Sequence, residues 1–240
     1  MATVGDLLRR ARTILQEITQ DGTRWTNTEL LDWLNEAYAT VLAIRPSANA
    51  INAEFGCAAG TRQELPDQAD RLLGVVRNLA SKAQGLMVTH IDRGTLDATR
   101  RRWHGEPQTE AIEHFVFDDL DPRRFYVYPP AAATAKLEIV YSRVPEPHGQ
   151  SEARPDSVEA LRLPESYAPI LLDMVLARAF SKDAEHAANL QRATLHSQSA
   201  QAALGEIAVL LEREFGGACR SHDVLFSAGI LKKTGLRIGV

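Results

Sequence analysis

The sequence contains little cysteine, no long apolar run and no excess of positive charge. Its two cysteines, Cys57 and Cys219, lie far apart, so they predict no disulfide framework and favour a reducing compartment. No window approaches the roughly 18 uncharged apolar residues of a transmembrane helix, so no membrane partner is expected. Charges recur throughout residues 1–15, which therefore lack the apolar core of a signal peptide.

The charge balance limits how the protein could meet nucleic acid. Among 240 residues, 24% are charged and the formal net charge is -4. A protein that wraps nucleic acid usually has a basic face, so this balance argues against such a role for the whole surface. Passive passage of DNA is compatible with it, because a mildly acidic surface repels phosphates. The length suffices for one large domain or two small ones.

The common catalytic and phosphate-binding motifs are missing. The sequence has no G-x-S-x-G motif, no G-x-G-x-x-G loop and no P-loop lysine. Cys219 and His222 have C-x-x-H spacing, but no second pair supplies the other ligands that a structural zinc needs. His186 and His196 share a helical face without the Glu-x-x-His pattern of di-metal bundles, which favours solvated or interfacial histidines. We therefore expect neither enzyme activity nor a cofactor.

An acidic run, Asp118, Asp119 and Asp121, offers carboxylates of the kind that bind Ca²⁺ or Mg²⁺. No glycine turn or distal glutamate completes a calcium-binding loop around it. Because Asp is also a common turn former, we interpret the run as the loop of a β-hairpin.

Helical periodicity dominates the N-terminal part of the chain. Thr26 and Glu29 form the sequence signature of a capping box, and Pro46 ends the helix that they start. An earlier amphipathic helix is predicted from apolar residues at helical spacing: Val4, Leu7, Leu8, Ala11, Ile14, Leu15 and Ile18. The apolar stripe of the second helix is Leu30, Leu31, Leu34, Ala37, Tyr38, Val41 and Leu42.

A second pair of helices is predicted after residue 160. The SKD sequence between them is too short for anything but an antiparallel hairpin, and Asp183 can cap the second helix. That helix runs from about Ala184 to Glu214 and is rich in alanine, which permits close helix–helix approach. The apolar face of the preceding helix is Tyr167, Ile170, Leu171, Met174, Val175 and Phe180.

The middle of the chain changes to a period of two. Ile51, Ala53, Phe55 and Cys57 alternate with polar or small residues, which indicates a half-buried strand. The AAGTRQE sequence that follows predicts a hairpin-type return. Further strands are predicted at 72–80, 85–92, 113–119, 124–130 and around 137–141, with a short helix after Asp92.

These patterns predict an α+β fold. In the simplest arrangement, residues 1–46 and 161–215 form a helical bundle built from both chain ends. Residues 47–160 are then an inserted β-rich module, and residues 216–240 an extended C-terminal arm. Two consecutive α+β units are the alternative.

The C-terminal arm differs in charge from the rest of the chain. In Ala218–Val240, Arg220, Lys232, Lys233 and Arg237 outnumber Asp223, which gives a charge of +3 and leaves -7 for the other residues. A basic, partly apolar arm of this kind is suited to docking on a partner.

The densest basic and aromatic cluster is Arg100, Arg101 and Arg102, followed by Trp103. Such a cluster could contact DNA through its phosphates and by stacking. The alternative is a solvated helix face beside a core or interface tryptophan. The negative overall charge favours this alternative.

The order of several sequence blocks resembles the phage adaptor (head-to-tail connector) protein family of tailed bacteriophages, over about residues 5–210. The blocks lie at 24–46 (RWTNTELLDWLNEAYATVLAIRP), 57–66 (CAAGTRQELP), 72–78 (LLGVVRN), 114–130 (HFVFDDLDPRRFYVYPP), 137–145 (LEIVYSRVP) and 163–196 (from LPESYAP to RATLH).

The resemblance implies a homo-oligomeric ring, typically a dodecamer, in the virion neck beneath the portal, assembled in the host cytoplasm. Such a ring extends the channel for double-stranded DNA and is a platform for the tail nozzle or tail tube. The helical bundle would form its wall, and no activity or cofactor belongs to the family. C-terminal extensions in the family commonly grip the portal. The docking residues expected here are Arg220, Val224, Leu225, Phe226, Lys232, Lys233 and Arg237.

Other roles compatible with the sequence are a tail-completion or tail-terminator protein, an enzyme and a DNA-binding module. Direct contact with the portal distinguishes an adaptor from a terminator. Tight DNA binding with a steep salt dependence would indicate a DNA-binding module.

Overall fold

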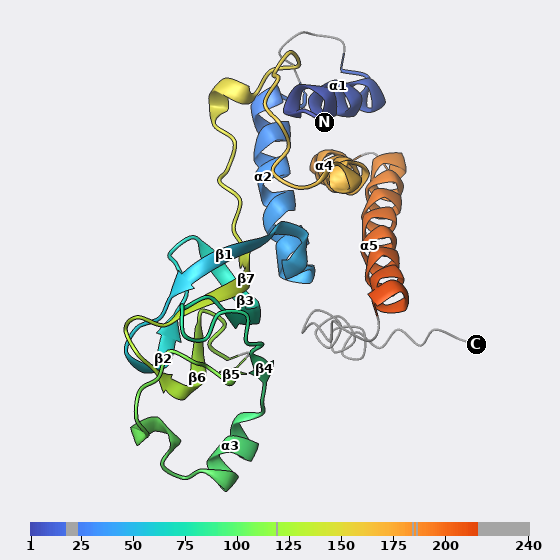
Figure 1. Cartoon of the computed structure of the whole chain (residues 1–240). Coiled ribbons are helices and arrows are strands. Elements are labelled where there is room, and N and C mark those ends of the chain that lie inside the picture. The colour runs from blue at the N-terminus through green and yellow to red at the C-terminus, as the bar shows by residue number, and fades with distance from the viewer. Residues whose placement is uncertain (18–23, 119, 184, 186, 216–240) are drawn as a thin grey trace, which may run out of the picture. The chain divides into compact units, whose positions relative to one another are not determined.

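The computed structural model describes residues 1–17, 24–118, 120–183, 185 and 187–215. In these residues, five α-helices and two β-sheets form an α+β fold, as the sequence predicts. The chain divides into two compact units. The described residues of 1–48 and 145–215 form the helical unit, and those of Asn49–Val144 form the β unit (Figure 1). None of the described helices is long and apolar enough to cross a membrane.

The first two helices begin at capping boxes. In α1 (Val4–Leu15), Thr3 and Asp6 exchange hydrogen bonds between their side chains and backbone N–H groups. The predicted pair Thr26 and Glu29 does the same at the start of α2 (Asn27–Ile44). Each box satisfies N–H groups that have no partner within the first helical turn. The helix α2 ends just before Pro46, as predicted.

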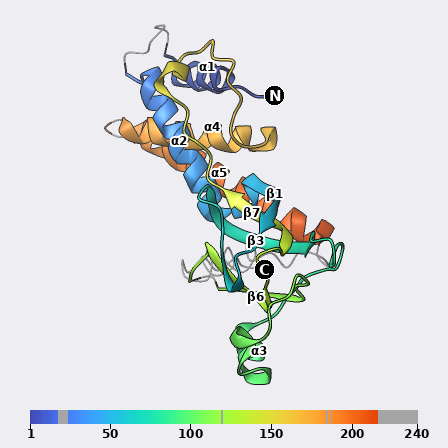
Figure 2. The same ribbon diagram turned by 60° about the vertical axis from the view of Figure 1, so that its left-hand side comes forward.

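The last two helices pack against each other. A 3-10 turn (Glu165–Tyr167) leads into α4 (Ala168–Lys182), and α5 (Ala187–Phe215) follows. Asp173 of α4 bonds Ser199 of α5, whereas Phe180, further along α4, stacks on His196. Residues further along α4 thus contact residues earlier in α5, so the two helices are antiparallel, as predicted. Figure 2 shows the helical unit from a second side.

All four of these helices contribute to one apolar core. The residues predicted to form the stripe of α2 are all at most 5% exposed. The prediction fails at Ile14 of α1, which is 43% exposed. The fully buried centre of the core is formed by Val4, Leu8, Ala11, Leu30, Leu31, Leu34, Val41, Leu171, Val175, Leu176 and Ala179.

The β unit consists of two sheets. The first has the order β1-β7-β3, with β1 (Ala50–Gly56), β7 (Lys136–Arg143) and β3 (Ala69–Asn78). The second has the order β2-β6-β5-β4, with β2 (Gly60–Glu64), β6 (Arg124–Ala131), β5 (His114–Phe117) and β4 (Thr89–His90). Leu137, Ile139 and Tyr141 of β7 lie in the core between buried residues of both sheets, as their alternation predicts.

The predicted hairpin return after β1 is wrong. The strand β1 pairs with β7, whereas β2 pairs with β6 in the other sheet. Gly60 has a φ of 104°, a conformation that favours glycine, and a bulge follows it. The amide of Gln63 bonds the backbone of Ala58 and Gly60 and holds this crossing from one sheet to the other.

A short helix, α3 (Arg93–Thr99), lies between β4 and β5, at one end of the β unit in both views (Figures 1 and 2). Asp92 caps it by accepting a hydrogen bond from the backbone N–H of Thr95, as predicted. Its only buried residue, Leu96, packs with Trp103, Val116 and Tyr128.

Candidate functional site

Over the part of α5 whose side chains the structure describes, most residues are not covered by other described residues. In its first half and middle, the buried residues are Ala193, Ala200 and Leu204. Leu190 and Leu195 are 56% and 64% exposed, and Ala188, Ala202 and Gly205 are also exposed. We call these five residues the α5 face.

The α5 face is poor in charge. Between Ala188 and Gly205 the only Lys, Arg, Asp or Glu is Arg192, whereas 24% of the whole chain is charged. The Arg192 guanidinium lies over the ring of Phe180, 5.6 Å from its centre. Solvated helix faces are normally charged, so a face with exposed leucines and alanines is more typical of a surface that is covered in an assembly.

His196 is an interfacial histidine. Its Nδ1 lies 2.8 Å from Oδ1 of Asp173, and its ring stacks on Phe180. The structure therefore gives it a role in joining α4 to α5. His186 lies outside the described residues. Within the parts of the chain that the structure describes, no three His, Cys, Asp or Glu residues are placed to hold a metal ion.

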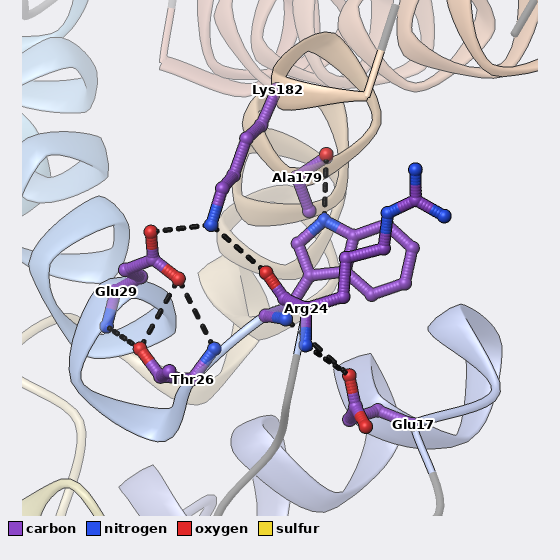
Figure 3. A network of polar contacts seen from close by, with 7 residues as sticks. Glu17, Arg24, Thr26, Glu29, Ala179 and Lys182 are labelled. Carbon is purple, nitrogen blue, oxygen red and sulfur yellow. Dashed lines mark hydrogen bonds and ion pairs between the residues drawn. The ribbon is translucent and has the colours of Figure 1, made fainter.

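A polar network joins the start of α2 to the end of α4 (Figure 3). The Lys182 ammonium donates to Glu29 at 2.6 Å and to the backbone oxygen of Arg24 at 2.9 Å. The Trp25 indole N–H donates to the backbone oxygen of Ala179 at 2.9 Å. The hydrogen bond from Lys182 is the largest cause that lowers the pKa of Glu29. This network fixes the junction of helices from opposite ends of the chain.

Asp183 also belongs to this junction. It is buried, forms an ion pair with Arg24, and accepts a hydrogen bond from the Asn189 side chain at 2.6 Å. It was expected to cap the last helix. It is instead the C-cap of α4, and α5 begins four residues later at Ala187.

Residues 145–160 pack on the helical unit, whereas the sequence pattern placed them with the β-rich module. Their backbone oxygens reach the N-terminus of α1, where Val4 N–H donates to Glu159 and Gly5 N–H to Ser157. A Cβ atom at Gly5 would lie 2.4 Å from the Ser157 oxygen, so only glycine allows this approach. The connection thus supplies acceptors to N–H groups that a helix start leaves free.

The same connection is anchored on α2 by His148, which is 3% exposed. Its backbone N–H donates to the Asn35 side chain, and its Nε2 lies 3.0 Å from the Tyr38 hydroxyl. That hydroxyl accepts the N–H of Arg162, so its own hydrogen is free to be donated to Nε2. The arrangement therefore suits a neutral imidazole.

Burial shifts both groups of this pair. Desolvation, followed by the charge of Arg162, lowers the pKa of His148. Desolvation also raises the pKa of Tyr38 to about 12. Both shifts favour the uncharged forms, which is the expected effect of removing a titratable group from water.

The predicted DNA-contact cluster is only partly available at the surface. Trp103 is 1% exposed and donates its indole N–H to Asp97, so it is a core residue and cannot stack on a base. Arg100 lies over the ring of Tyr128 and 3.7 Å from Glu106. Arg101 and Arg102 are exposed, and neither forms an ion pair with a described residue. Two of the three arginines therefore have free guanidinium groups.

The acidic run lies in the loop of a β-hairpin, as the sequence predicts. Asp118 accepts the N–H of Leu120, and Asp121 accepts a hydrogen bond from Arg124 at 3.1 Å in the turn between β5 and β6. Asp119 lies outside the described residues.

Cys57 is buried, which raises the pKa of its thiol to about 12.

The expected docking residues of the arm lie outside the described residues, as do Cys219 and His222. Sequence reasoning also missed contacts that the structure shows. Nothing in the sequence marks His148 as buried, because its neighbours are polar. Gly5 gave a weak signal, since a glycine in the first turn of an apolar helix needs a packing reason.

Comparison with known proteins gives one family. A family model described as SU10 adaptor protein matches residues 2–221. No curated protein matches the chain. The matched region includes nearly all the described residues of both units, with all the helices and strands described above. The chain therefore belongs to the SU10 adaptor protein family, and is a structural phage protein of the head–tail junction.

Proposed function

We propose that this protein forms a homo-oligomeric ring, a dodecamer, that binds the portal and extends the DNA channel toward the tail. The single observation that carries the proposal is the α5 face, which is nearly uncharged and is not covered by the described residues, in a chain of an adaptor family. A subunit of a closed ring needs two different complementary surfaces, one for each neighbour. The α5 face supplies one of them.

The helical unit is suited to the wall of such a ring. Hydrogen bonds from Lys182 to Glu29 and from Trp25 to Ala179 join the N-terminal and C-terminal parts of the chain within this unit. A wall that transmits load between capsid and tail requires elements that do not separate, and contacts between distant parts of the chain provide this. The β unit would then contact the tail nozzle or tail-tube protein.

The C-terminal arm is the proposed contact with the portal. Its charge of +3 contrasts with the acidic remainder of the chain. The proposed docking residues are Arg220, Val224, Leu225, Phe226, Lys232, Lys233 and Arg237. A basic and apolar segment of this kind gains order when it binds an acidic, partly apolar surface.

We further propose that double-stranded DNA passes through the channel without specific binding. Tight phosphate binding would slow ejection, and the net charge of -4 opposes it. Arg101 and Arg102 are the candidates for transient phosphate contact, together with Arg100 if Glu106 releases it. Stacking is not part of this contact, because Trp103 is buried.

The direct test is electron microscopy of the full chain mixed with the portal of the same phage. We expect rings attached to the portal, and no attachment for a chain that lacks residues 216–240. Attachment without those residues would exclude the arm as the portal contact. A ring on the tail tube that never touches the portal would indicate a tail terminator instead of an adaptor.

A further inference from the structure

The two sheets of the β unit have four edge strands, and three of them are protected. The strand β3 has three register shifts against β7, and residues 85–88 bond its outer side through Asn78 and Val76. The strand β4 is only two residues long. The strand β2 has a bulge and carries Arg62 and Glu64. Bulges, short length, charge and cover are the usual means by which proteins prevent pairing at sheet edges.

The fourth edge strand, β1, has no bulge and is not short, and its only charged residue is Glu54. Its seven residues pair with β7 in an unbroken register from Ala50 to Gly56. It contains no proline, lysine or arginine. Among the described residues, the backbone of β1 bonds only to β7, so alternate N–H and C=O groups on its other side have no partner.

The side chains of β1 also leave the core incomplete at this edge. Ile51, Ala53 and Phe55 pack against the core but are only half-buried. Their cross-strand partners on β7, Tyr141, Ile139 and Leu137, are at most 3% exposed. One more strand beside β1, with apolar residues on the same face, would cover these three side chains.

We propose that β1 accepts an added strand formed by Leu236–Val240 of a second copy of this chain. In this segment Leu236, Ile238 and Val240 alternate with Arg237 and Gly239. The alternation would place the three apolar residues on the face of Ile51, Ala53 and Phe55 in a parallel or an antiparallel ladder.

The charge of Arg237 supports Leu236–Val240 as the added strand, and the length of the arm sets how far that strand can reach. Arg237 would lie on the other face of the strand, with Asn52 and Glu54. Glu54 is 57% exposed and already pairs with Lys136 at 2.7 Å, so its carboxylate is accessible to a second cation. The 20 residues between Phe215 and Leu236 would span at most about 66 Å when extended, at about 3.3 Å per residue, which is the greatest distance over which the strand could be donated.

The choice of a second copy rests on the proposed ring. The proposal moves Arg237 from the portal contact proposed above to the neighbouring subunit, and leaves the other docking residues, from Arg220 to Lys233, for the portal. In a ring, each arm would add a backbone ladder between neighbours.

The first experiment uses the full chain carrying Ile238→Asp, whose own arm no longer competes for β1. A fluorescent peptide with the sequence of residues 229–240 is titrated against it, and binding is followed by anisotropy. We expect saturable binding, weakened by about tenfold or more when the peptide itself carries Ile238→Asp, because a carboxylate would then face the core. No saturable binding of the unchanged peptide would overturn the proposal.

A charge exchange tests the position of the strand. The Glu54→Lys substitution should weaken peptide binding by roughly threefold to tenfold, and a peptide with Arg237→Glu should recover it. The matched control is Asp67→Lys, an equal charge change at an exposed site on the β2–β3 connection, which should leave binding unchanged. Equal weakening by both protein variants would show attraction by net charge alone, and would overturn the β1 assignment.

Sedimentation of the unmodified chain identifies the donor of the strand. Association that rises with concentration and is lost with Ile238→Asp would support a second copy. A monomer at every concentration, with peptide binding intact, would show that the segment folds back on its own chain and would overturn the choice of a neighbour. If the Ile238→Asp chain forms rings on the portal but does not bind the unchanged peptide, the added strand is ruled out and the proposed function still stands.

Discussion

The helical unit and the β unit are held together in different ways. In the helical unit, contacts join residues that are about 150 positions apart, such as Trp25 with Ala179 and Lys182 with Glu29. The β unit is one continuous stretch, Asn49–Val144, with a core of its own. The helical unit therefore depends on both ends of the chain, whereas the β unit depends on neither. Substitutions in one unit should affect that unit first.

The largest expected effect is a cavity in the helical core. Leu171 of α4 is fully buried in the core that the four helices share, so Leu171→Ala should lower the free energy of unfolding of the helical unit by about 2–5 kcal/mol. Denaturant unfolding measures this loss, with hydrogen exchange to locate it. Leu190→Ala, at an exposed site of α5, is the control and should have little effect. Equal destabilisation by the two substitutions would contradict the assigned core.

The corresponding change in the β unit is Asn78→Ala. The Asn78 side chain, which is fully buried, donates to the backbone oxygens of Leu86 and Ile112 and accepts the Ile112 N–H. Truncation leaves the N–H and the oxygen of Ile112 without this partner, whereas the Leu86 oxygen keeps the Asn78 backbone N–H, and should cost about 1–3 kcal/mol in the same unfolding assay. Asn52→Ala removes an exposed hydrogen bond to Glu138 and is the control. Hydrogen exchange should show the loss in 69–131 and none in the helical unit. Loss spread over both units would contradict their independence.

A smaller effect is expected from pH. The folded state lowers the pKa of His148 below its ordinary value of 6.5, so it favours the neutral ring. The contribution to stability is complete above pH 6.5 and decreases as the pH falls below it, because the unfolded chain then binds a proton that the folded chain excludes. The protection of 146–152 from hydrogen exchange, measured relative to the intrinsic exchange rate at each pH, should therefore decrease as the pH is lowered from 7.5 to 5.5.

The control for this pH effect is a histidine in the other unit. His104→Gln should leave the pH dependence of 146–152 unchanged, since His104 is exposed on the β unit. His148→Gln should remove most of that dependence. A pH response that persists in His148→Gln would show that another group causes it.

The smallest effect on stability is expected at the α5 face. Leu195 is 64% exposed, so Leu195→Glu should change the free energy of unfolding by no more than about 0.5 kcal/mol. Thermal unfolding of the monomer measures this. A large loss would mean that α5 is packed more tightly in its own chain than the structure shows.

Local signals in the sequence predicted much of the fold. The Thr26–Glu29 capping box, the stripe of α2 and the alternation of β7 each depend on neighbouring residues, and each is confirmed. The pairing of β1 with β7 could not be predicted, because the partner strand lies about 85 residues away and no local pattern encodes it. The hairpin expected after β1 fails for this reason.

The candidate site was less predictable than the fold. The alanine content of α5 indicated close packing, but not which face remains uncovered, because this depends on where α4 lies. The cluster at Arg100–Arg102 was predicted from composition alone. In the structure, Trp103 is buried and Arg100 contacts Glu106 and Tyr128, whereas Arg101 and Arg102 form no ion pair with a described residue. The sequence pattern could not predict this difference, because it depends on where Glu106 and Tyr128 lie.

The central claim is that the α5 face joins neighbouring subunits in a ring on the portal. Electron microscopy of portal mixed with the Leu195→Glu chain tests it most directly, beside the matched substitution Leu86→Glu at a leucine of the β unit that is 54% exposed. We predict that Leu195→Glu abolishes the ring and that Leu86→Glu retains it. Complete rings with Leu195→Glu would contradict the claim.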